Sequence, residues 1–298
     1  MIRVFLTGGI CAVCLVYARG GNSPDIKSTI AFVQKLQTAS GGFLPGPAFK
    51  GKMPTLRATS AAVRALKYLE PGTMIAIPNK EMAAKFVASC FDKDRGGFAD
   101  TPGGKPDVFS TAVGLMAVVE LKMPLADYQE PAVKYLSEHS KTFEDIRIAV
   151  AGLEAIKQDS PRAAAWLEQV EKMRDPDGTY GKELGQARDT GGAVVAVLRL
   201  KGKVTDVKQV LKVLKEGQRL SGGYGKADTE LASDLETTYR VMRAFVMLKA
   251  RPDDVEGIRS FVAKCRNEDG GYAVVPGEPS TVGGTYFAAI IRHWLEKK

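Results

Sequence analysis

A phrase of two glycines and an aromatic residue recurs along the chain, each time between two segments with the apolar spacing of helices. The segment from Phe32 to Phe43 aligns without a gap with the segment from Phe261 to Tyr272. Residues 86–98 repeat the phrase with one extra residue. Such internal repetition determines the architecture before any single residue indicates a chemistry, and it implies that most recurring residues build the repeat.

Each repeat is predicted to be a helical hairpin, in which an outer helix, a glycine turn and an inner helix follow one another. The turns begin at residues 41, 96, 177, 222 and 270. The long interval after the second turn contains a helix pair without glycines, at Glu130–His139 and Ile146–Ile156, which predicts a degenerate third unit and six units in all. The fold class is therefore all-α.

The composition of the helices predicts how the hairpins are arranged. The inner helices are rich in Ala and Gly, which permit close approach, whereas the outer helices carry more Lys and Glu. Open repeat arrays usually end in atypical polar caps, but the first and last units resemble each other. A closed ring is thus favoured over an open superhelix.

The glycine pairs are predicted to be left-handed C-caps of the outer helices, because glycine adopts that conformation with little strain. Unit four has Asp177 before Gly178, which predicts that the first glycine of the pair is the replaceable one.

Composition and charge exclude some classes of function. The chain has 298 residues, of which 45% are hydrophobic and 26% charged, so a sizeable core is expected. Its formal charge of +8 is spread along the sequence without a run of five or six basic residues. No nucleic-acid partner is expected, because a nucleic-acid groove requires clustered cations. Attraction to an anionic ligand is compatible with the charge.

Residues 1–18 are predicted to be a signal peptide. A basic start precedes 15 apolar residues from Val4 to Ala18, fewer than the roughly 20 needed to span a bilayer. We expect export to the periplasm or the medium, with membrane contact through this leader only. A hydrophobic first helix or a misassigned start codon is the alternative. The domain is then expected over residues 24–298.

The cysteines beyond the leader are predicted to be buried and unpaired. Cys90 and Cys265 hold the position that Leu36 holds in the first unit, which makes it an apolar packing position. Equivalent positions in non-adjacent repeats rarely come within the roughly 7 Å that a disulfide requires.

With four Gly-Gly-Phe/Tyr turns in helical context, and phrases such as that from Ser233 to Phe245, the chain resembles the prenyltransferase and squalene-cyclase repeat superfamily. The likeness covers residues 24–298 and is greatest to the β subunit of protein prenyltransferases and its short bacterial relatives. It implies an α/α toroid of six inner and six outer helices. It also implies an apolar cavity in the mouth of the ring, suited to an isoprenoid or another apolar small molecule.

The chain departs from the family at the residues that carry its known chemistry. Protein prenyltransferases hold zinc through an Asp-x-Cys pair and a later His, but here Glu236 follows Asp234 where the Cys belongs. The later inner helix opens with Val282 and offers no His, and His139 and His293 lie elsewhere. No metal or other cofactor is therefore expected. The Asp-x-Asp-Asp acid of the triterpene cyclases is also missing, so the resemblance leaves open whether the chain is an enzyme.

The candidate ligand-binding residues are polar side chains near the starts of inner helices. They are Arg57, Asp107, Arg188, Asp189, Asp234, Glu236, Tyr239 and Arg243. Arg57, Asp189 and Glu236 are predicted to share one position of the repeat. Asp107 and Asp234 are predicted to share another, where a carboxylate first serves as a helix cap. The arginines would bind a diphosphate or pair with neighbouring carboxylates.

Three functions remain open at this point. The first is a prenyltransferase-like toroid that binds an isoprenoid or other apolar ligand, although the missing zinc ligands count against transferase activity. The second is a non-catalytic exported scaffold, for which the sequence indicates no particular protein partner. The third is a hydrolase or lyase acting on a polysaccharide through paired carboxylates. An aromatic cavity lining favours the first, a filled ring the second, and facing carboxylates the third.

Overall fold

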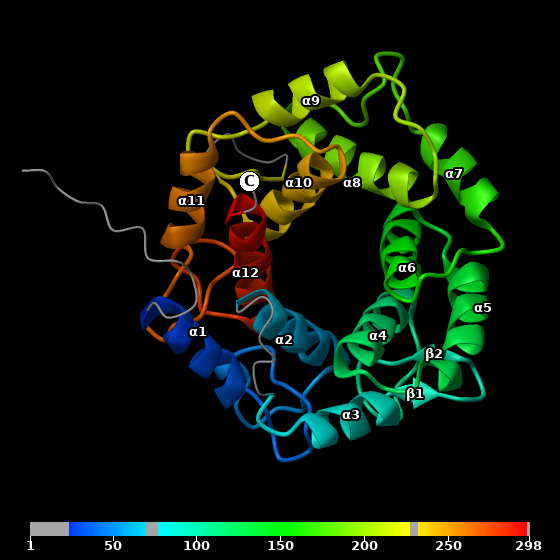
Figure 1. Ribbon diagram of the computed structural model, residues 1–298, viewed down its shortest axis with the longest axis vertical. Coiled ribbons are helices and arrows are strands. Elements are labelled where there is room, and N and C mark those ends of the chain that lie inside the picture. The colour runs from blue at the N-terminus through cyan, green and yellow to red at the C-terminus, as the bar shows by residue number, and fades with distance from the viewer. Residues whose placement is uncertain (1–23, 70–76, 227–231, 297–298) are drawn as a thin grey trace, which may run out of the picture.

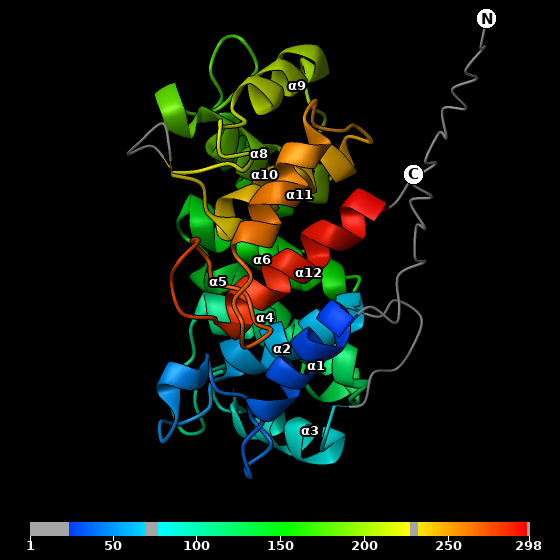
Figure 2. The same ribbon diagram turned by 90° about the vertical axis from the view of Figure 1, so that its left-hand side faces the viewer.

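The computed structural model describes residues 24–69, 77–226 and 232–296, and the predicted leader lies outside these residues. The helices form two concentric rings (Figure 1; Figure 2 gives the side view). The inner helices are α2 (Leu56–Leu69), α4 (Val108–Leu121), α6 (Phe143–Ala155), α8 (Gln186–Arg199), α10 (Leu235–Met247) and α12 (Val282–Glu296). The outer helices are α1 (Pro24–Lys35), α3 (Lys80–Ser89), α5 (Gln129–His139), α7 (Ala163–Glu171), α9 (Val207–Glu216) and α11 (Val255–Lys264).

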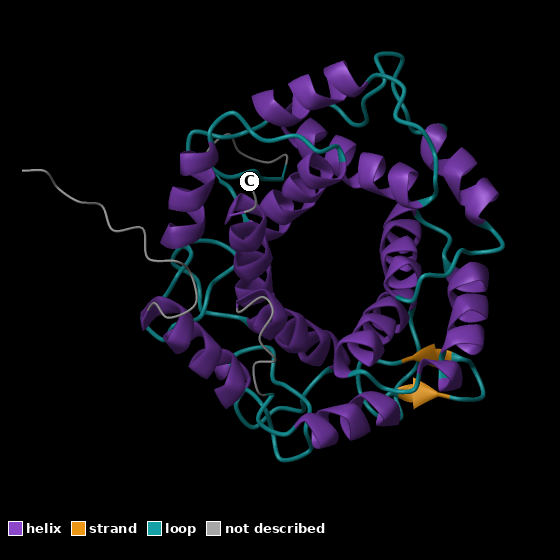
Figure 3. Ribbon diagram, in the orientation of Figure 1, coloured by secondary structure: helices purple, strands orange, loops and turns teal. Residues whose placement is uncertain are grey.

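The predicted all-α toroid of six hairpins is confirmed (Figure 3). Helices α5 and α6 form the degenerate third unit. The short remaining elements are the 3₁₀ turns η1 (Pro47–Phe49), η2 (Leu125–Asp127) and η3 (Glu183–Gly185), and an antiparallel pair of β1 (Phe91–Asp92) and β2 (Gly97–Phe98).

The ring is closed by contacts between its last and first units. Helix α12 packs along α2, as each inner helix packs along the next. At the mouth of the ring, the backbone N–H of Val282 donates to the carbonyl of Pro45 at 2.8 Å. The same bond joins Leu56 in the first unit to the carbonyl of Asp100 in the second, at 2.7 Å. The closing contact therefore repeats the contacts inside the ring.

The glycine turns differ from the prediction. Helix α1 ends at Lys35, well before Gly41, so the glycine does not cap the helix. The turn instead closes a short antiparallel ladder in which Gln37 pairs with Phe43. A Cβ on Gly41 would come within 2.2 Å of the carbonyl carbon of Met82 on α3. The backbone of the turn therefore packs directly against this next outer helix.

The first glycine of each pair has a positive φ, which disfavours any residue with a side chain. These glycines are Gly41, Gly96, Gly178, Gly222 and Gly270. Unit four therefore keeps the first glycine as Gly178 and replaces the second by Thr179, the reverse of the prediction.

The second glycine makes room for an aromatic ring of the neighbouring unit. A Cβ on Gly223 would lie 2.5 Å from the Phe261 ring on α11. Counted from the capping residues of α9 and α11, Val213 holds the position on α9 that Phe261 holds on α11. This smaller neighbour explains why unit four accepts Thr179.

A buried threonine on each of five inner helices fixes the register between turn and helix. Its Oγ1 accepts a hydrogen bond of 3.0–3.1 Å from the backbone N–H of the turn aromatic. The pairs are Thr59 with Phe43, Thr111 with Phe98, Thr190 with Tyr180, Thr238 with Tyr224, and Thr285 with Tyr272. These threonines also correct the predicted repeat alignment. Arg57, Arg188 and Glu236 each lie two residues before the threonine of their helix, so Arg188 and not Asp189 shares the position of Arg57 and Glu236.

Cys90 and Cys265 are buried and unpaired, as predicted. Burial raises the pKa of each thiol to about 12, which makes them unreactive core groups. None of the helices in the described part of the chain is long and apolar enough to cross a membrane.

Candidate functional site

The inner ring encloses a cavity of about 580 Å³. Small residues such as Ala58, Ala61 and Ala151 line it, and their side chains are too short to fill the centre. All six inner helices contribute to the lining, so the cavity is a product of ring closure.

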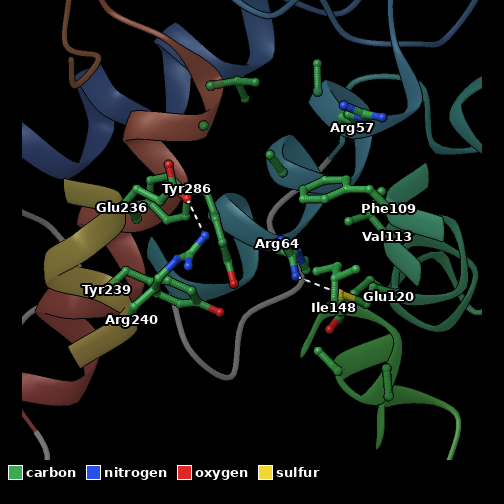
Figure 4. A pocket seen from close by; sticks show the side chains of 18 of the residues that line it. Arg57, Arg64, Phe109, Val113, Glu120, Ile148, Glu236, Tyr239, Arg240 and Tyr286 are labelled. Carbon is green, nitrogen blue, oxygen red and sulfur yellow. Dashed lines mark hydrogen bonds and ion pairs between the residues drawn. The ribbon is translucent and has the colours of Figure 1, made fainter. Parts of the chain in front are cut away.

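Aromatic side chains form one wall of the cavity, over α10 and α12 (Figure 4). The ring centroids of Tyr239 and Tyr286 lie 5.8 Å apart, and Phe287 lies 5.2 Å from Tyr239. Behind them, Trp294 stacks on Tyr239 at 5.5 Å. Such a wall offers a large apolar surface with polar hydroxyl groups at its edge.

The charged residues of the lining are mostly paired. Six arginines line the cavity, namely Arg57, Arg64, Arg147, Arg199, Arg240 and Arg243, together with the carboxylates of Asp100, Glu120, Glu154 and Glu236. Each of these carboxylates is held by a cation: Asp100 by Arg57, Glu120 by Lys67, Glu154 by Arg199 and Glu236 by Arg240. No carboxylate of the described lining is therefore left unpaired for general acid–base chemistry.

One salt-bridge network joins two inner helices, α6 and α10, that are not neighbours in the ring. Arg240 on α10 donates to both oxygens of Glu144 on α6, at 2.9 and 3.1 Å, and to Glu236 at 3.0 Å. Arg147 also contacts Glu144 at 2.9 Å. Helix α8 lies between α6 and α10, and Gly192 on α8 lies beside Arg147, where a Cβ would stand 3.6 Å from its Cδ.

The arginines also determine the protonation of Glu144. Burial raises the pKa of its carboxyl group, but the hydrogen bond from Arg240 and the charges of Arg147 and Arg240 outweigh that effect and lower it to about 2. The network therefore stays ionised at neutral pH.

Positive charge also surrounds the phenol of Tyr239. Burial raises its pKa, but Arg243, Arg64 and Arg199 together with a hydrogen bond from Tyr286 lower it to about 7. Burial raises the pKa of Tyr286 far above its usual value, so Tyr239 is the acidic member of the pair. The surroundings of Tyr239 thus favour a negative charge at its hydroxyl.

The structure brings together half of the sequence-predicted ligand-binding residues. Arg57, Glu236, Tyr239 and Arg243 line the cavity. The other four are Asp107, Asp234, Arg188 and Asp189, and none of them lines it. Whether any of the eight binds a ligand stays a prediction.

The residues outside the lining have structural partners. Asp107 and Asp234 cap α4 and α10 by accepting from the N–H groups of Ser110 and Thr237, both at 2.7 Å. Arg188 pairs with Asp189 at 3.2 Å.

Arg64 and Tyr286 also line the cavity, although they are not among the residues predicted from the sequence. Arg64 lies five positions after Thr59, as Arg243 lies five after Thr238. Tyr286 directly follows Thr285, as Tyr239 follows Thr238. Both could have been found by extending the repeat alignment two turns into the inner helices.

The residues present do not fit the zinc site of protein prenyltransferases. Both carboxylate oxygens of Asp234 are engaged by Thr237, through its N–H and its hydroxyl at 2.8 Å. Glu236 stands in place of the Cys and is held by Arg240. Among the described residues, no three His, Cys, Asp or Glu side chains cluster as metal ligands. Asp234 and Glu236 thus serve as a helix cap and a salt-bridge partner in the positions of the zinc ligands.

The family's sequence model, described as the prenyltransferase alpha-alpha toroid domain, matches residues 9–81, 72–143 and 146–296. The chain belongs to the prenyltransferase alpha-alpha toroid family. No curated protein matches it by sequence.

Solved structures share this toroid. Candida albicans protein geranylgeranyltransferase-I complexed with GGPP has a TM-score of 0.69 and 13% identity, over 90% of each chain. A single-residue variant of type II terpene cyclase MstE from Scytonema, in complex with the substrate geranylgeranyl dihydroxybenzoate, has a TM-score of 0.62 and 10% identity, over 91% of this chain and 95% of the other. A glycosidase variant has a TM-score of 0.59 and 14% identity, over 91% of this chain and 96% of the other. At these identities the likeness concerns the fold alone.

Proposed function

We propose that this toroid binds an isoprenoid or another apolar small molecule inside its central cavity, without zinc-dependent prenyl transfer. The aromatic wall of Tyr239, Tyr286 and Phe287 carries the proposal. It faces small aliphatic side chains across an open lumen, the combination of apolar surface and few polar groups typical of small-molecule sites.

The neighbouring structures support an apolar ligand of this class. The geranylgeranyltransferase is complexed with GGPP, and the cyclase holds a geranylgeranyl substrate. The glycosidase likeness gives less support to a hydrolase, because each carboxylate of the described lining is held by a cation. The open cavity counts against a pure scaffold.

A titration of the full chain with geranylgeraniol tests the proposal. Trp294 stacks on the wall residue Tyr239, so its fluorescence should change with a saturable dependence on the alcohol. Trp166, the other tryptophan, is buried in the outer helix α7, and a Trp294→Phe variant should lose the signal. Calorimetry gives the binding constant without a fluorophore.

Ala61→Phe should abolish binding, because Ala61 lines the lumen and a phenyl ring there would occupy it. Ala263→Phe is the matched control on the exposed side of α11 and should bind as the wild type does. Lack of binding by the wild type would favour the scaffold. Release of sugars from a polysaccharide would favour the hydrolase, and stoichiometric zinc in the purified protein would contradict the site assignment.

A further inference from the structure

Arg64 and Arg243 differ from the other arginines of the cavity, because neither forms an ion pair with a carboxylate of the described residues. Arg64 Nη1 lies 2.8 Å from the thioether sulfur of Met116, and Arg243 Nη2 lies 3.4 Å from the hydroxyl of Tyr239. A thioether is a weak acceptor, and a single phenol oxygen uses only one of the several N–H donors of a guanidinium group. The Nε atoms of both arginines are buried without a hydrogen bond.

The two arginines lie at one depth in the ring. Arg64 lies seven residues after Arg57 on α2, and Arg243 lies seven after Glu236 on α10. At about 1.5 Å per residue, both are about 10 Å further inside than these mouth residues. Helix α12 packs between α2 and α10, and it places Tyr286 between them.

The aromatic wall holds both guanidinium groups. The Arg64 guanidinium carbon lies 4.1 Å from the centroid of Tyr286. That of Arg243 lies 4.6 Å from Trp294 and 5.6 Å from Tyr239. Stacking on an aromatic side chain fixes the plane of a guanidinium group and leaves the N–H donors in that plane free to form hydrogen bonds. Such an arrangement suits a planar or tetrahedral anion.

Two half-buried cations without carboxylates are unfavourable unless a counter-charge lies near them. The hydroxyl of Tyr239 supplies part of that charge, because the surrounding arginines favour its ionised form. An anion with several acceptor oxygens would accept from the remaining Nη donors of both arginines, which one phenol oxygen does not.

We propose that Arg64 and Arg243 together bind the anionic head group, a phosphate or a carboxylate, of an apolar-chain ligand, two helical turns inside the mouth. The chain lies back toward the mouth, over a surface formed by Ala58, Ala61, Phe109 and Val113. This inference rests on the proposed function, since it adds a head group and an orientation to the apolar ligand of the cavity.

Three ligands with one chain test it by calorimetry: farnesyl diphosphate, farnesoic acid and farnesol. At least one anionic ligand should bind the wild type about tenfold or more tightly than farnesol, and the tighter of the two identifies the head group. Arg64→Met and Arg243→Met should each weaken anion binding about ten- to hundredfold, the range for a lost charge-assisted hydrogen bond, and weaken farnesol binding by a much smaller factor. Arg95→Met, on an outer turn, is the matched control and should change neither.

Farnesol binding that persists in each variant also reports that it is folded, and helical circular dichroism checks this independently. Farnesol binding as tight as both anions would overturn the inference and leave the proposed function standing. A loss that follows Arg57→Met but neither Arg64→Met nor Arg243→Met would place the head group at the mouth and overturn it too. Failure of all three ligands to bind would remove the proposed function itself.

Discussion

The guanidinium carbon of Arg64 lies 4.1 Å from the centroid of the Tyr286 ring, across the contact between α2 and α12. This contact joins the first inner helix to the last, so one stacked pair both closes the ring and forms part of the cavity wall. An open spiral of the same hairpins would separate the two residues. The stability of the toroid and the geometry of its site therefore depend on the same seam.

Ring closure predicts energetic coupling between Gly271 and Phe32, which come from the last and first units. A Cβ on Gly271 would lie 2.6 Å from the Phe32 ring, so Gly271→Ala should destabilise the protein by about 1–3 kcal/mol through overpacking. Phe32→Val in the same chain should relieve the clash. In urea unfolding, we expect the double variant to be more stable, by about 0.5–3 kcal/mol, than the added effects of the two single substitutions would make it.

The pair Gly42 and Phe86 gives a matched control inside the ring, because a Cβ on Gly42 would lie 2.8 Å from the Phe86 ring. Gly42→Ala and Phe86→Val should show coupling of the same sign. If the chain were an open spiral in solution, only this internal pair would be coupled.

The glycine pattern predicted the fold because each turn needs a backbone that few other residues adopt. The pattern did not reveal which glycine is indispensable, since two adjacent glycines look alike in sequence. Only unit four distinguishes them, because it has Thr179 in place of the second glycine. On the next outer helix, the residue at the position that Phe261 holds on α11 is Val213, which is smaller. Thr179 and Val213 belong to neighbouring units, so the relation between them depends on the packing of the units and is not apparent from either unit alone.

The cavity was predicted less well than the fold. The starts of the inner helices drew attention to Arg57 and Glu236, which line the cavity, but a helix start carries capping residues as well as lining residues. Asp107 and Asp234 belong to the caps. Which of several polar side chains faces the lumen depends on the rotation of each inner helix, and the buried threonines fix that rotation.

The salt bridge between Glu144 and Arg240 predicts a loss of stability in acid. The pKa of Glu144 is lowered to about 2 in the folded protein, against roughly 4.3 in an unfolded chain. Its contribution is therefore complete above pH 4.5 and is lost as the pH falls toward 2. In urea unfolding, the wild type should exceed Glu144→Gln in stability at pH 5, and this difference should shrink as the pH is lowered.

Glu138→Gln, at an exposed position of α5, is the control for the charge change alone. A stability difference between wild type and Glu144→Gln that stays constant from pH 5 to pH 3 would show that the ion pair does not lower the pKa of Glu144.

Tyr239 predicts a second pH dependence, near neutrality. Its phenol faces Arg243 on its own helix, Arg64 on α2, Arg199 on α8 and Tyr286 on α12, and these groups lower its pKa to about 7 although burial opposes ionisation. Tyrosinate absorption in the ultraviolet should therefore rise near pH 7, well below the value of roughly 10 for an unfolded chain. Tyr239→Phe should remove this titration, and Arg243→Met should move it to higher pH.

The same shift predicts the sign of a stability effect. Between about pH 7 and roughly 10 the unfolded chain binds a proton that the folded protein has released, so folding stability should rise with pH in the wild type relative to Tyr239→Phe. A bound anion would compete with the phenolate for Arg64 and Arg243, so it should raise the pKa of Tyr239 and delay the absorption change. A titration that begins only near pH 10, with or without an anion, would show that the arginines do not act on Tyr239 as the geometry requires.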